Sequence, residues 1–375
     1  MGINVRRFLR EQGCVDEEIE RAEAEGWLTV LVLDHLVLPG ERRYTAGEVA
    51  ARAGVDRTVS KRLWRAMGFP DAFEDERAFA DVDVKALENA LEAVPDEAAL
   101  DLLVQQARVI GASMARVAEV LTDALIRGVR DLADAGRSQE EIAATLAETF
   151  QIDRLAPIID YIHRRQLVAS LRRRLVGQDG AMSGVLFEAV GFADLAGFTK
   201  ISQQLGSGEL TTLINRFESS SRDVVASLGG RVVKSIGDEI MFVADQPLVG
   251  ARIALAIVEV HERDDVLPPV KVGLDHGKVL ILDGDYFGPV VNRASRMTEL
   301  AREASVLTSA ELRETLADEE GFRWSDAGRR KLKDIGSVHL WRLRSAPGDG
   351  GGGGDVAGER EDVVAEVTAV LAEDG

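Results

Sequence analysis

Two aspartates end apolar, strand-like segments beside glycine or small residues. Asp194 lies in the run Phe192–Thr199, and Asp238 lies in the run Lys234–Glu239. A hard cation such as Mg²⁺ prefers oxygen ligands and usually takes one or two carboxylates together with substrate phosphates. Two such metals about 3.5–4 Å apart can clamp the attacking and leaving oxygens of an in-line displacement. The pair therefore points to chemistry on a phosphate chain, whereas either aspartate alone would more simply be a turn or helix-cap residue.

A second polar pair stands further along the chain. A helix is expected to begin near Pro289, since proline suits the first helical turn. Asn292 and Arg296 are four residues apart in that helix and share one face. An amide and a guanidinium projecting together could orient a ribose and neutralise charge on a reacting phosphorus. For this pair alone, an exposed polar helix face is the simpler interpretation.

The elements that must position these residues follow Ser183. Their order is strand, helix, two strands, helix and strand, which predicts a ferredoxin-like α+β fold with an antiparallel sheet and flanking helices. The expected elements are a strand at Val185–Val190, a helix at Ser207–Leu228, a hairpin of Arg231–Lys234 and Ile240–Val243 around Gly237-Asp238, a helix at Leu248–Glu262 and a strand at Val270–Leu282.

The first half of the chain has a different pattern of apolar residues. Apolar residues recur at helical spacing through residues 1–180, which predicts an all-α domain. Ser138 and Glu141 form a capping-box pattern at one helix start. A helix over Leu155–Leu175 becomes basic near its end and meets a break at Gly177–Gly180. We therefore expect three parts: a helical domain at 1–180 with this linker helix, an α+β domain at 183–345, and a tail at 346–375.

The tail opens with a glycine-rich run, Pro347–Gly354, which predicts a flexible linker. Beyond it, Val363, Val367 and Leu371 are among apolar residues that share one helical face. That spacing would allow a short docking helix, but a frayed acidic tail is the favoured interpretation.

Taken together, the three polar runs resemble the class III nucleotidyl cyclase catalytic domain over about Val185 to Leu343. The resemblance implies that Asp194, Asp238 and Leu195 bind two Mg²⁺ or Mn²⁺ ions. It implies that Asn292 and Arg296 stabilise the transition state.

The same resemblance implies further contacts with the triphosphate. Gly197, Phe198 and Thr199 open the next helix, where backbone N–H groups suit phosphate oxygens. Lys333 matches the family's late lysine that meets the triphosphate. That motif is short, Lys331 is an alternative, and a solvated surface lysine remains possible.

Two positions read the base in this family, and here they are Lys234 and Asp285. Adenine offers an acceptor at N1 and a donor at its amino group. Lysine only donates and ionised aspartate only accepts, so this pair matches adenine. Guanine presents the reverse pattern and would leave polar groups mispaired. The expected substrate is ATP, and the expected products are cyclic AMP and pyrophosphate.

The family builds each site from opposite sides of a dimer interface. One chain here carries the complete set, which implies a homodimer with two composite sites. The connection Gly277–Asp285 is shorter than the arm that many members use to embrace the partner. This departure bears on the size of the interface more than on the chemistry.

The helical half resembles the regulatory domain of actinobacterial soluble cyclases, which is autoinhibitory and pH-responsive. The layout and the segment Ile158–Tyr161 carry this looser resemblance. The basic linker helix would then act as a lever between two arrangements. His163 lies near the hinge and could titrate near neutral pH, although an ordinary structural or exposed histidine is the simpler reading.

Composition limits the alternatives. The 375 residues carry a net charge of −19, which argues against binding nucleic acid or anionic membrane through bulk charge. Cys14 is the only cysteine, which fits a reducing cytoplasm. Met1–Arg7 leads into polar sequence and no apolar run approaches about 18 residues, so neither a signal peptide nor a membrane span is expected.

Residues 44–67 provide the competing hypothesis. They resemble a winged helix-turn-helix with Val59–Arg65 as a recognition helix. Its basic residues are Arg57, Lys61, Arg62 and Arg65. A DNA-binding regulator with a nucleotide-sensing domain is therefore the alternative function. The net acidity and the complete polar set favour an enzyme instead, and also argue against an inactive cyclase-like scaffold.

Overall fold

The computed structural model describes residues 3–92, 94–150, 152–176 and 185–346. The chain divides into two compact units, an N-terminal unit up to Ser170 and a C-terminal unit from Leu171. The division falls inside one helix. The acidic tail with its alternative docking helix around Val363–Leu371, the glycine-rich run and the break at Gly177–Gly180 lie outside the described residues.

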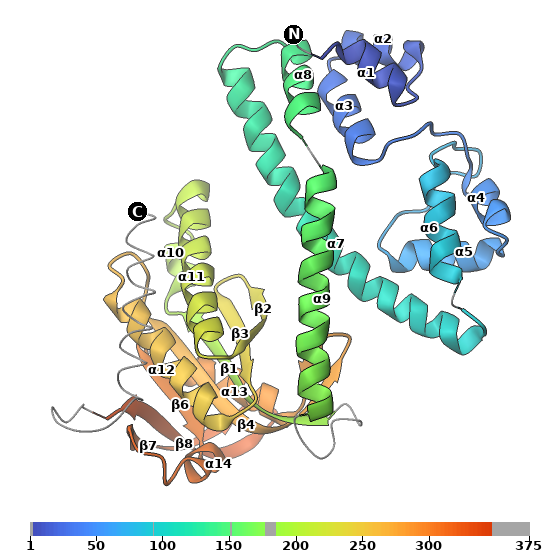
Figure 1. Ribbon diagram of the computed structural model, residues 1–375. Helices are drawn as coiled ribbons and strands as arrows, with labels where there is room; N and C mark the ends of the chain where they lie inside the picture. Colours follow the sequence, from blue (N-terminus) through green and yellow to red (C-terminus); the bar gives the residue numbers. More distant parts are fainter. Residues whose placement is uncertain (1–2, 93, 151, 177–184, 347–375) are drawn as a thin grey trace. The chain divides into compact units, whose positions relative to one another are not determined.

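The described part of the N-terminal unit is helical, with one isolated β-bridge between Tyr44 and Phe79. Among these residues no helix is long and apolar enough to cross a membrane. Its helices (Figure 1) are α1 (Val5–Glu11), α2 (Asp16–Glu25), α3 (Leu28–Val37), α4 (Ala46–Arg52), α5 (Arg57–Ala66), α6 (Asp81–Leu91), α7 (Glu97–Asp134), α8 (Gln139–Thr149) and α9 (Ile152–Val176), the last of which continues into the C-terminal unit.

Several small apolar clusters hold the N-terminal unit together. One lies among α1, α2, α3 and α8 and includes Leu9, Ile19 and Ala143. Two others lie among α4, α5, α6 and α7. The predicted capping box of α8 is confirmed, because Ser138 Oγ accepts from the Glu141 amide at 3.2 Å and Glu141 Oε2 accepts from the Ser138 amide at 2.8 Å.

The C-terminal unit contains a sheet with helices on both faces. Its strands are β1 (Val185–Leu195), β2 (Arg231–Ile236), β3 (Glu239–Ala244), β4 (Val270–Leu282), β5 (Asp285–Phe287), β6 (Ser305–Ser309), β7 (Phe322–Leu332) and β8 (Gly336–Ser345). Its helices after α9 are α10 (Phe198–Ile201), α11 (Ser207–Ser227), α12 (Pro247–Arg263), α13 (Pro289–Leu300) and α14 (Ala310–Thr315).

The strand order is β2-β3-β1-β4-β6-β8-β7, with β5 paired to β4. The prediction of an antiparallel sheet is wrong in one respect, because β4 and β6 are parallel and the sheet is mixed. The reason is the crossover through α13, which returns the chain to the same end of the sheet before β6 begins. The other paired strands are antiparallel.

The two faces of the sheet bury separate apolar cores. On one face, Phe217 of α11 and Ile253 of α12 pack with Phe242 of β3. On the other face, Val290 and Ala294 of α13 join a second cluster with residues of β1, β3 and β4. Figure 1 shows α11 and α12 lying along the sheet. Strand β1 thus packs against helices on both faces, and its candidate metal ligand, Asp194, lies at its end.

Candidate active site

The two predicted metal aspartates lie together at one end of the sheet. Asp194 is the penultimate residue of β1, and Asp238 lies in the tight turn between β2 and β3. The backbone at Gly237 has φ of 63°, a left-handed conformation that glycine adopts without strain. The Leu195 amide donates to the Asp238 carbonyl at 3.1 Å, which ties the turn to the end of β1. The sheet therefore brings the two carboxylates into one cluster.

Negative charge is concentrated at this cluster. Burial and the nearby Asp194 raise the pKa of Asp238 above its ordinary value. Glu239 follows directly in β3, and its pKa rises to about 7 because of burial and the charges of Asp194 and Asp238. Close carboxylates that cannot all ionise comfortably are a natural place for a cation. The donor set fits hard divalent metals.

Lys271 and Glu239 were not identified from the sequence. Strand pairing places both opposite Asp194, Glu239 from β3 and Lys271 from β4. Lys271 Nζ forms an ion pair with Asp194 Oδ2, and both side chains are mostly covered. Their roles depend on strand register, which the sequence does not reveal. The available signal is a lysine inside the otherwise apolar strand Val270–Leu282.

The segment after β1 turns sharply beside the aspartates. Gly197 has φ of 73° and precedes α10, which is a single turn containing Phe198 and Thr199. The Ala196 amide donates to the Pro269 carbonyl at 2.8 Å, which fixes the turn on the sheet. A shallow hollow of about 460 Å³ lies here, lined by Ala196, Gly197, Lys271, Ala301, Arg302 and Glu303. Its two cations would suit an anionic ligand.

The two predicted base-reading residues contact one another. Lys234 of β2 donates from Nζ to both carboxylate oxygens of Asp285, at 2.8 and 2.6 Å. The Tyr286 amide also donates to Asp285 Oδ1 at 2.8 Å, which fixes the carboxylate at the start of β5. Both side chains remain over a third exposed, at 36% and 37%. The pair is thus a ready donor and acceptor at an accessible surface.

Helix α13 carries the other predicted pair. Asn292 is exposed, and Arg296 is half-buried and forms an ion pair with Glu299. The helix lies very close to β4 because Gly273 has no side chain. A Cβ at Gly273 would stand only 2.2 Å from the Ala294 carbonyl oxygen and 2.4 Å from the Thr298 amide nitrogen. Gly273 therefore determines how closely α13, which carries Asn292 and Arg296, packs against β4.

A buried ion pair joins the same helix to strand β4. Asp275 of β4 is fully buried; its Oδ2 accepts from Arg293 Nε and its Oδ1 from Ser309 Oγ, both at 2.6 Å. Burial raises the pKa of Asp275, although Arg293 favours its charged form. The arrangement joins α13 to β4 and to the end of β6 through charge-assisted bonds.

The remaining predicted lysine lies at the far end of the sheet order. Lys333 is exposed in the turn between β7 and β8, next to Asp334, whose φ is 63°. Within the described part of the chain no ion pair joins Lys333 to the aspartates. Lys331, the alternative, is exposed in β7. His163 is exposed on α9.

Three of the four basic residues singled out in the helix pair at residues 44–67 have acidic partners. Lys61 and Arg65 both form ion pairs with Asp71, at 2.9 and 2.5 Å, and Arg62 pairs with Asp101 at 2.5 Å. These acidic groups reduce the positive field that α5 could present to a phosphate backbone. The geometry of this region therefore favours a structural role over contact with nucleic acid.

Two family models match the chain and together cover most of it. Residues 3–175 match the adenylate cyclase regulatory domain. Residues 188–345 match the adenylate and guanylate cyclase catalytic domain. The chain thus combines the mixed-sheet cyclase domain with a helical regulatory domain before it.

Curated relatives match across both halves. An adenylate cyclase of Streptomyces coelicolor is 35% identical over 352 residues, which covers 86% of this chain and 91% of the relative. An adenylate cyclase of Streptomyces griseus is 36% identical over 278 residues, covering 73% and 69%. A pH-sensitive adenylate cyclase of Mycobacterium tuberculosis is 30% identical over 365 residues, covering 92% and 89%. The chain therefore belongs to the adenylate cyclase family, with a regulatory domain ahead of its cyclase catalytic domain.

Proposed function

We propose that this chain converts ATP into 3′,5′-cyclic AMP and pyrophosphate. The observation that carries the proposal is the joining of Asp194 and Asp238 at one end of the sheet. Lys234 and Asp285 support the choice of base. As neighbouring donor and acceptor, they match N1 and the amino group of adenine.

Asp194, Asp238 and the Leu195 carbonyl would hold two Mg²⁺ or Mn²⁺ ions. Those ions would supply charge neutralisation on the triphosphate and lower the pKa of the ribose 3′-hydroxyl. Lys271 begins as the counter-ion of Asp194 and would be released to bind a phosphate oxygen when that aspartate takes a different partner. The backbone amides of Gly197, Phe198 and Thr199 would receive the phosphate chain.

The other residues would act on the ribose and the α-phosphate. Asn292 would orient the ribose so that its 3′-oxygen faces the α-phosphorus. Arg296 would exchange Glu299 for the phosphate oxygens that gain charge during displacement. Lys333, from its exposed turn, would bind the outer phosphates. Positioning and electrostatics carry nearly all of this reaction, because no covalent intermediate with the protein is required.

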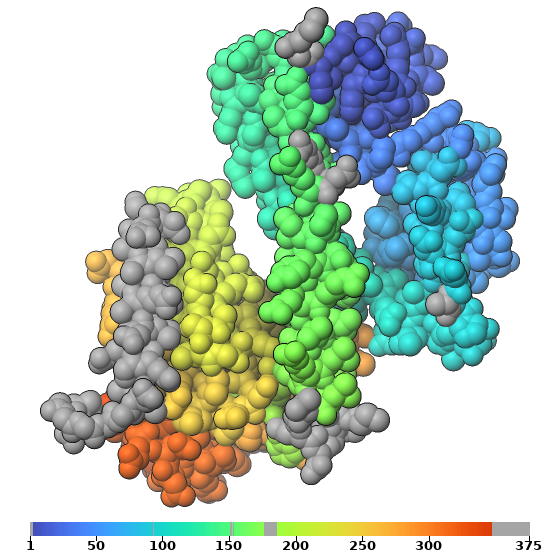
Figure 2. Space-filling view, viewed as in Figure 1, coloured from blue at the N-terminus to red at the C-terminus, as the bar shows by residue number. Residues whose placement is uncertain are grey.

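The proposal includes a homodimer whose two sites each draw residues from both protomers. The exposed apolar side chains of α7 and α9 support association of two chains. Ile110 and Val120 of α7 are 57% and 69% exposed, and Ile158 and Leu167 of α9 are 53% and 50% exposed. Figure 2 shows that the viewed side of α9, in green, is open to solvent over much of its length.

The linker helix is the proposed route of regulation. From Leu171 onward α9 belongs to the C-terminal unit. Burial and the charge of Arg231 lower the pKa of Arg173, so its guanidinium sits near the buried Glu188–Arg231 pair that joins β1 to β2. A shift of α9 would therefore change the charges around β1, the strand that carries Asp194. Autoinhibition and pH response would act through this helix.

Substrate turnover tests the activity directly. Full-length protein is assayed with ATP and with GTP, each with Mg²⁺ and with Mn²⁺. We expect cyclic AMP and pyrophosphate from ATP and little product from GTP. Equal turnover of both nucleotides would contradict the role given to Lys234 and Asp285, and no product from either would contradict the proposed function.

Complementation tests the composite site. Asp194→Ala and Arg296→Ala chains are each expected to be inactive alone. Mixed chains should recover activity, because one of the two sites in a mixed dimer keeps both functional halves. A mixture as inactive as its parents, despite exchange of subunits, would contradict the shared site.

Truncation tests the regulation. Residues 183–345 alone should be more active than the full chain and should show a flatter pH dependence. The comparison is made at equal protein concentration over the same pH series. Matching rates and pH profiles for the two forms would contradict control by the N-terminal unit.

A further inference from the structure

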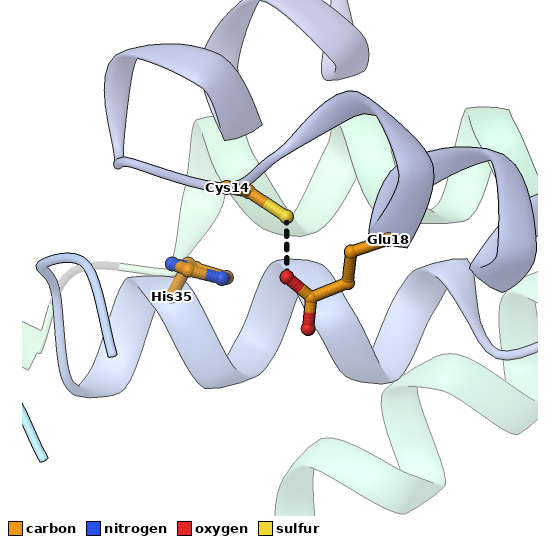
Figure 3. A group of neighbouring side chains, drawn as sticks. All are labelled: Cys14, Glu18 and His35. Atoms are coloured by element: carbon orange, nitrogen blue, oxygen red, sulfur yellow. Dashed lines mark hydrogen bonds between the residues drawn. The ribbon is translucent and has the colours of Figure 1, made fainter. Parts of the chain in front are cut away.

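Three side chains with metal-binding atoms converge in the N-terminal unit, and none of them belongs to the proposed cyclase site. Cys14 lies in the turn between α1 and α2, Glu18 in the first half of α2, and His35 in the last turn of α3 (Figure 3). One ligand atom from each lies within 4.8 Å of the other two. The side chains point toward one another from separate elements of the fold.

Burial distinguishes this cluster from an ordinary surface group. Cys14 is 6% exposed and His35 is 4% exposed, while Glu18 is half-buried. Cys14 Sγ donates to Glu18 Oε2 at 3.2 Å. The walls are apolar, because Cys14 belongs to a cluster with Leu31 and Val32 of α3. A polar group enclosed here has few possible partners besides the cluster itself.

His35 supplies an independent observation. Its Nδ1 is fully buried and has no hydrogen-bond partner among the described residues. An unpaired buried polar atom is destabilising, so buried polar atoms in folded proteins nearly always have a hydrogen-bond or metal partner. A metal ion bound through Nδ1 would supply the partner that this atom lacks.

We propose that Cys14, Glu18 and His35 bind a zinc ion. Thiolate sulfur, imidazole nitrogen and carboxylate oxygen are the three ligand types that zinc uses, and a water molecule can complete a tetrahedral set. Around such an ion the ligand atoms lie roughly 3.3–3.7 Å apart, from Zn–S of about 2.3 Å and Zn–N or Zn–O of about 2.0–2.2 Å. The cluster needs only small side-chain adjustments to reach this spacing.

Charge balance also supports zinc. Binding removes the proton of the Cys14 thiol, which passes to solvent, while His35 stays neutral and Glu18 stays ionised. The thiolate and the carboxylate then balance the two positive charges of the ion. The ion would join the α1–α2 turn to α3.

Cobalt(II) replacement gives a specific test, because Cys14 is the only cysteine of the chain. The full-length protein carrying Asp194→Ala and Asp238→Ala is used, so that the proposed cyclase metals do not interfere. Titration with Co²⁺ should produce a thiolate-to-cobalt charge-transfer absorption that saturates at equimolar metal. Added Zn²⁺ should abolish the band by displacing cobalt.

Variants then assign the ligands. Cys14→Ser should lose the band entirely. Glu18→Gln and His35→Gln should weaken binding of Zn²⁺ by more than the roughly 10–100-fold typical of losing an outer-shell partner. Glu17→Gln is the matched control, because Glu17 is exposed on the same helical turn. It should bind as tightly as the parent chain.

The parent chain decides the question even if a variant unfolds. Circular dichroism identifies variants that have lost their helices, and those are set aside. Absence of a charge-transfer band in the folded parent chain would overturn the proposal. So would unchanged zinc affinity in a folded Glu18→Gln and His35→Gln double variant.

Discussion

The two units bury charge in opposite ways. In the C-terminal unit, Asp275 and Glu188 lie inside the fold and pair with Arg293 and Arg231, which joins separate strands and helices. In the described part of the N-terminal unit each ion pair keeps at least one partner well exposed, such as Arg62 with Asp101 at 44% and 60%, and none of its paired carboxylates is buried. Buried pairs demand one geometry, whereas exposed pairs can break and re-form. The contrast agrees with the proposal that the C-terminal unit holds a fixed site and that the N-terminal unit rearranges.

Apolar packing shows the same contrast. One large cluster covers the inner face of the sheet and includes Phe217, Phe242 and Ile257. The N-terminal helices share several smaller clusters, and α7 buries only Val104 and Ala107 along its length. Small separate cores are easier to open and reset than one continuous core. The difference predicts where substitutions should affect chemistry, where they should affect stability, and where they should do neither.

The largest expected effect separates chemistry from stability inside the C-terminal unit. Asp238→Asn removes a proposed metal ligand, so kcat should fall at least about a thousand-fold, roughly 4 kcal/mol of transition-state stabilisation. The folded protein should be no less stable, because burial and Asp194 already raise the pKa of Asp238. Cyclic AMP formation and urea unfolding of the metal-free protein measure the two effects. A variant that retains activity would remove the aspartate from the site.

The second prediction compares a buried ion pair with an exposed one. Asp275→Ala leaves Arg293 and Ser309 without their partner and should lower the free energy of unfolding by roughly 3 kcal/mol. Asp101→Ala breaks the exposed pair with Arg62 and should cost between about 0 and 1 kcal/mol. Urea unfolding of each variant gives the comparison. Equal losses would contradict the difference drawn between the two units.

Sequence reasoning recovered the part of the fold that local patterns encode. The strand at Val270–Leu282 agrees with β4, and the helix at Ser207–Leu228 agrees with α11 within one residue. Apolar periodicity, glycine turns and Pro289 were sufficient for these elements. Strands β6, β7 and β8 were not predicted. Their pairing and the parallel β4–β6 contact depend on long-range register rather than on local pattern.

The candidate site divides in the same way. Asp194 and Asp238 were found because each stands beside a turn at a strand end. Lys271 and Glu239 were missed because they reach the same cluster through strand pairing. The cluster of Cys14, Glu18 and His35 was missed for a similar reason, since His35 comes from another helix.

The third prediction concerns the accessible pair that is proposed to read the base. Lys234→Met removes the donor for adenine N1, so kcat/KM for ATP should fall about a hundred-fold. The loss for GTP should be smaller, which lowers the preference for ATP. Stability should change little, because the Lys234–Asp285 pair is over a third exposed. Initial rates with both nucleotides measure the effect. An unchanged ATP-to-GTP ratio would show that these residues do not set base choice.

The smallest expected effect is a pH-dependent contribution of one buried histidine to the stability of the C-terminal unit. His261 of α12 is 1% exposed, and its Nδ1 donates to the Ile257 carbonyl at 2.7 Å. Burial lowers its pKa, so the folded state keeps it neutral while the unfolded chain binds a proton below about pH 6.5. The contribution of His261 to the stability of the C-terminal unit should therefore fall by roughly 1 kcal/mol as pH falls from 7.5 to 5.5. Glu239 contributes with the opposite sign, because its pKa is raised to about 7 and the folded state takes up its proton in the same range.

The matched variants decide which histidine is responsible. The stability difference between His261→Gln and the parent chain should change by roughly 1 kcal/mol over this pH range, in favour of the variant at low pH. His163→Gln, at an exposed position on α9, should follow the pH dependence of the parent chain. Urea midpoints across the pH series measure both. If His163→Gln instead flattened the pH profile of activity while His261→Gln did not, the pH response would belong to the linker helix and not to the stability of the sheet domain. A pH dependence of stability identical to that of the parent chain in both variants would contradict the contribution given to His261.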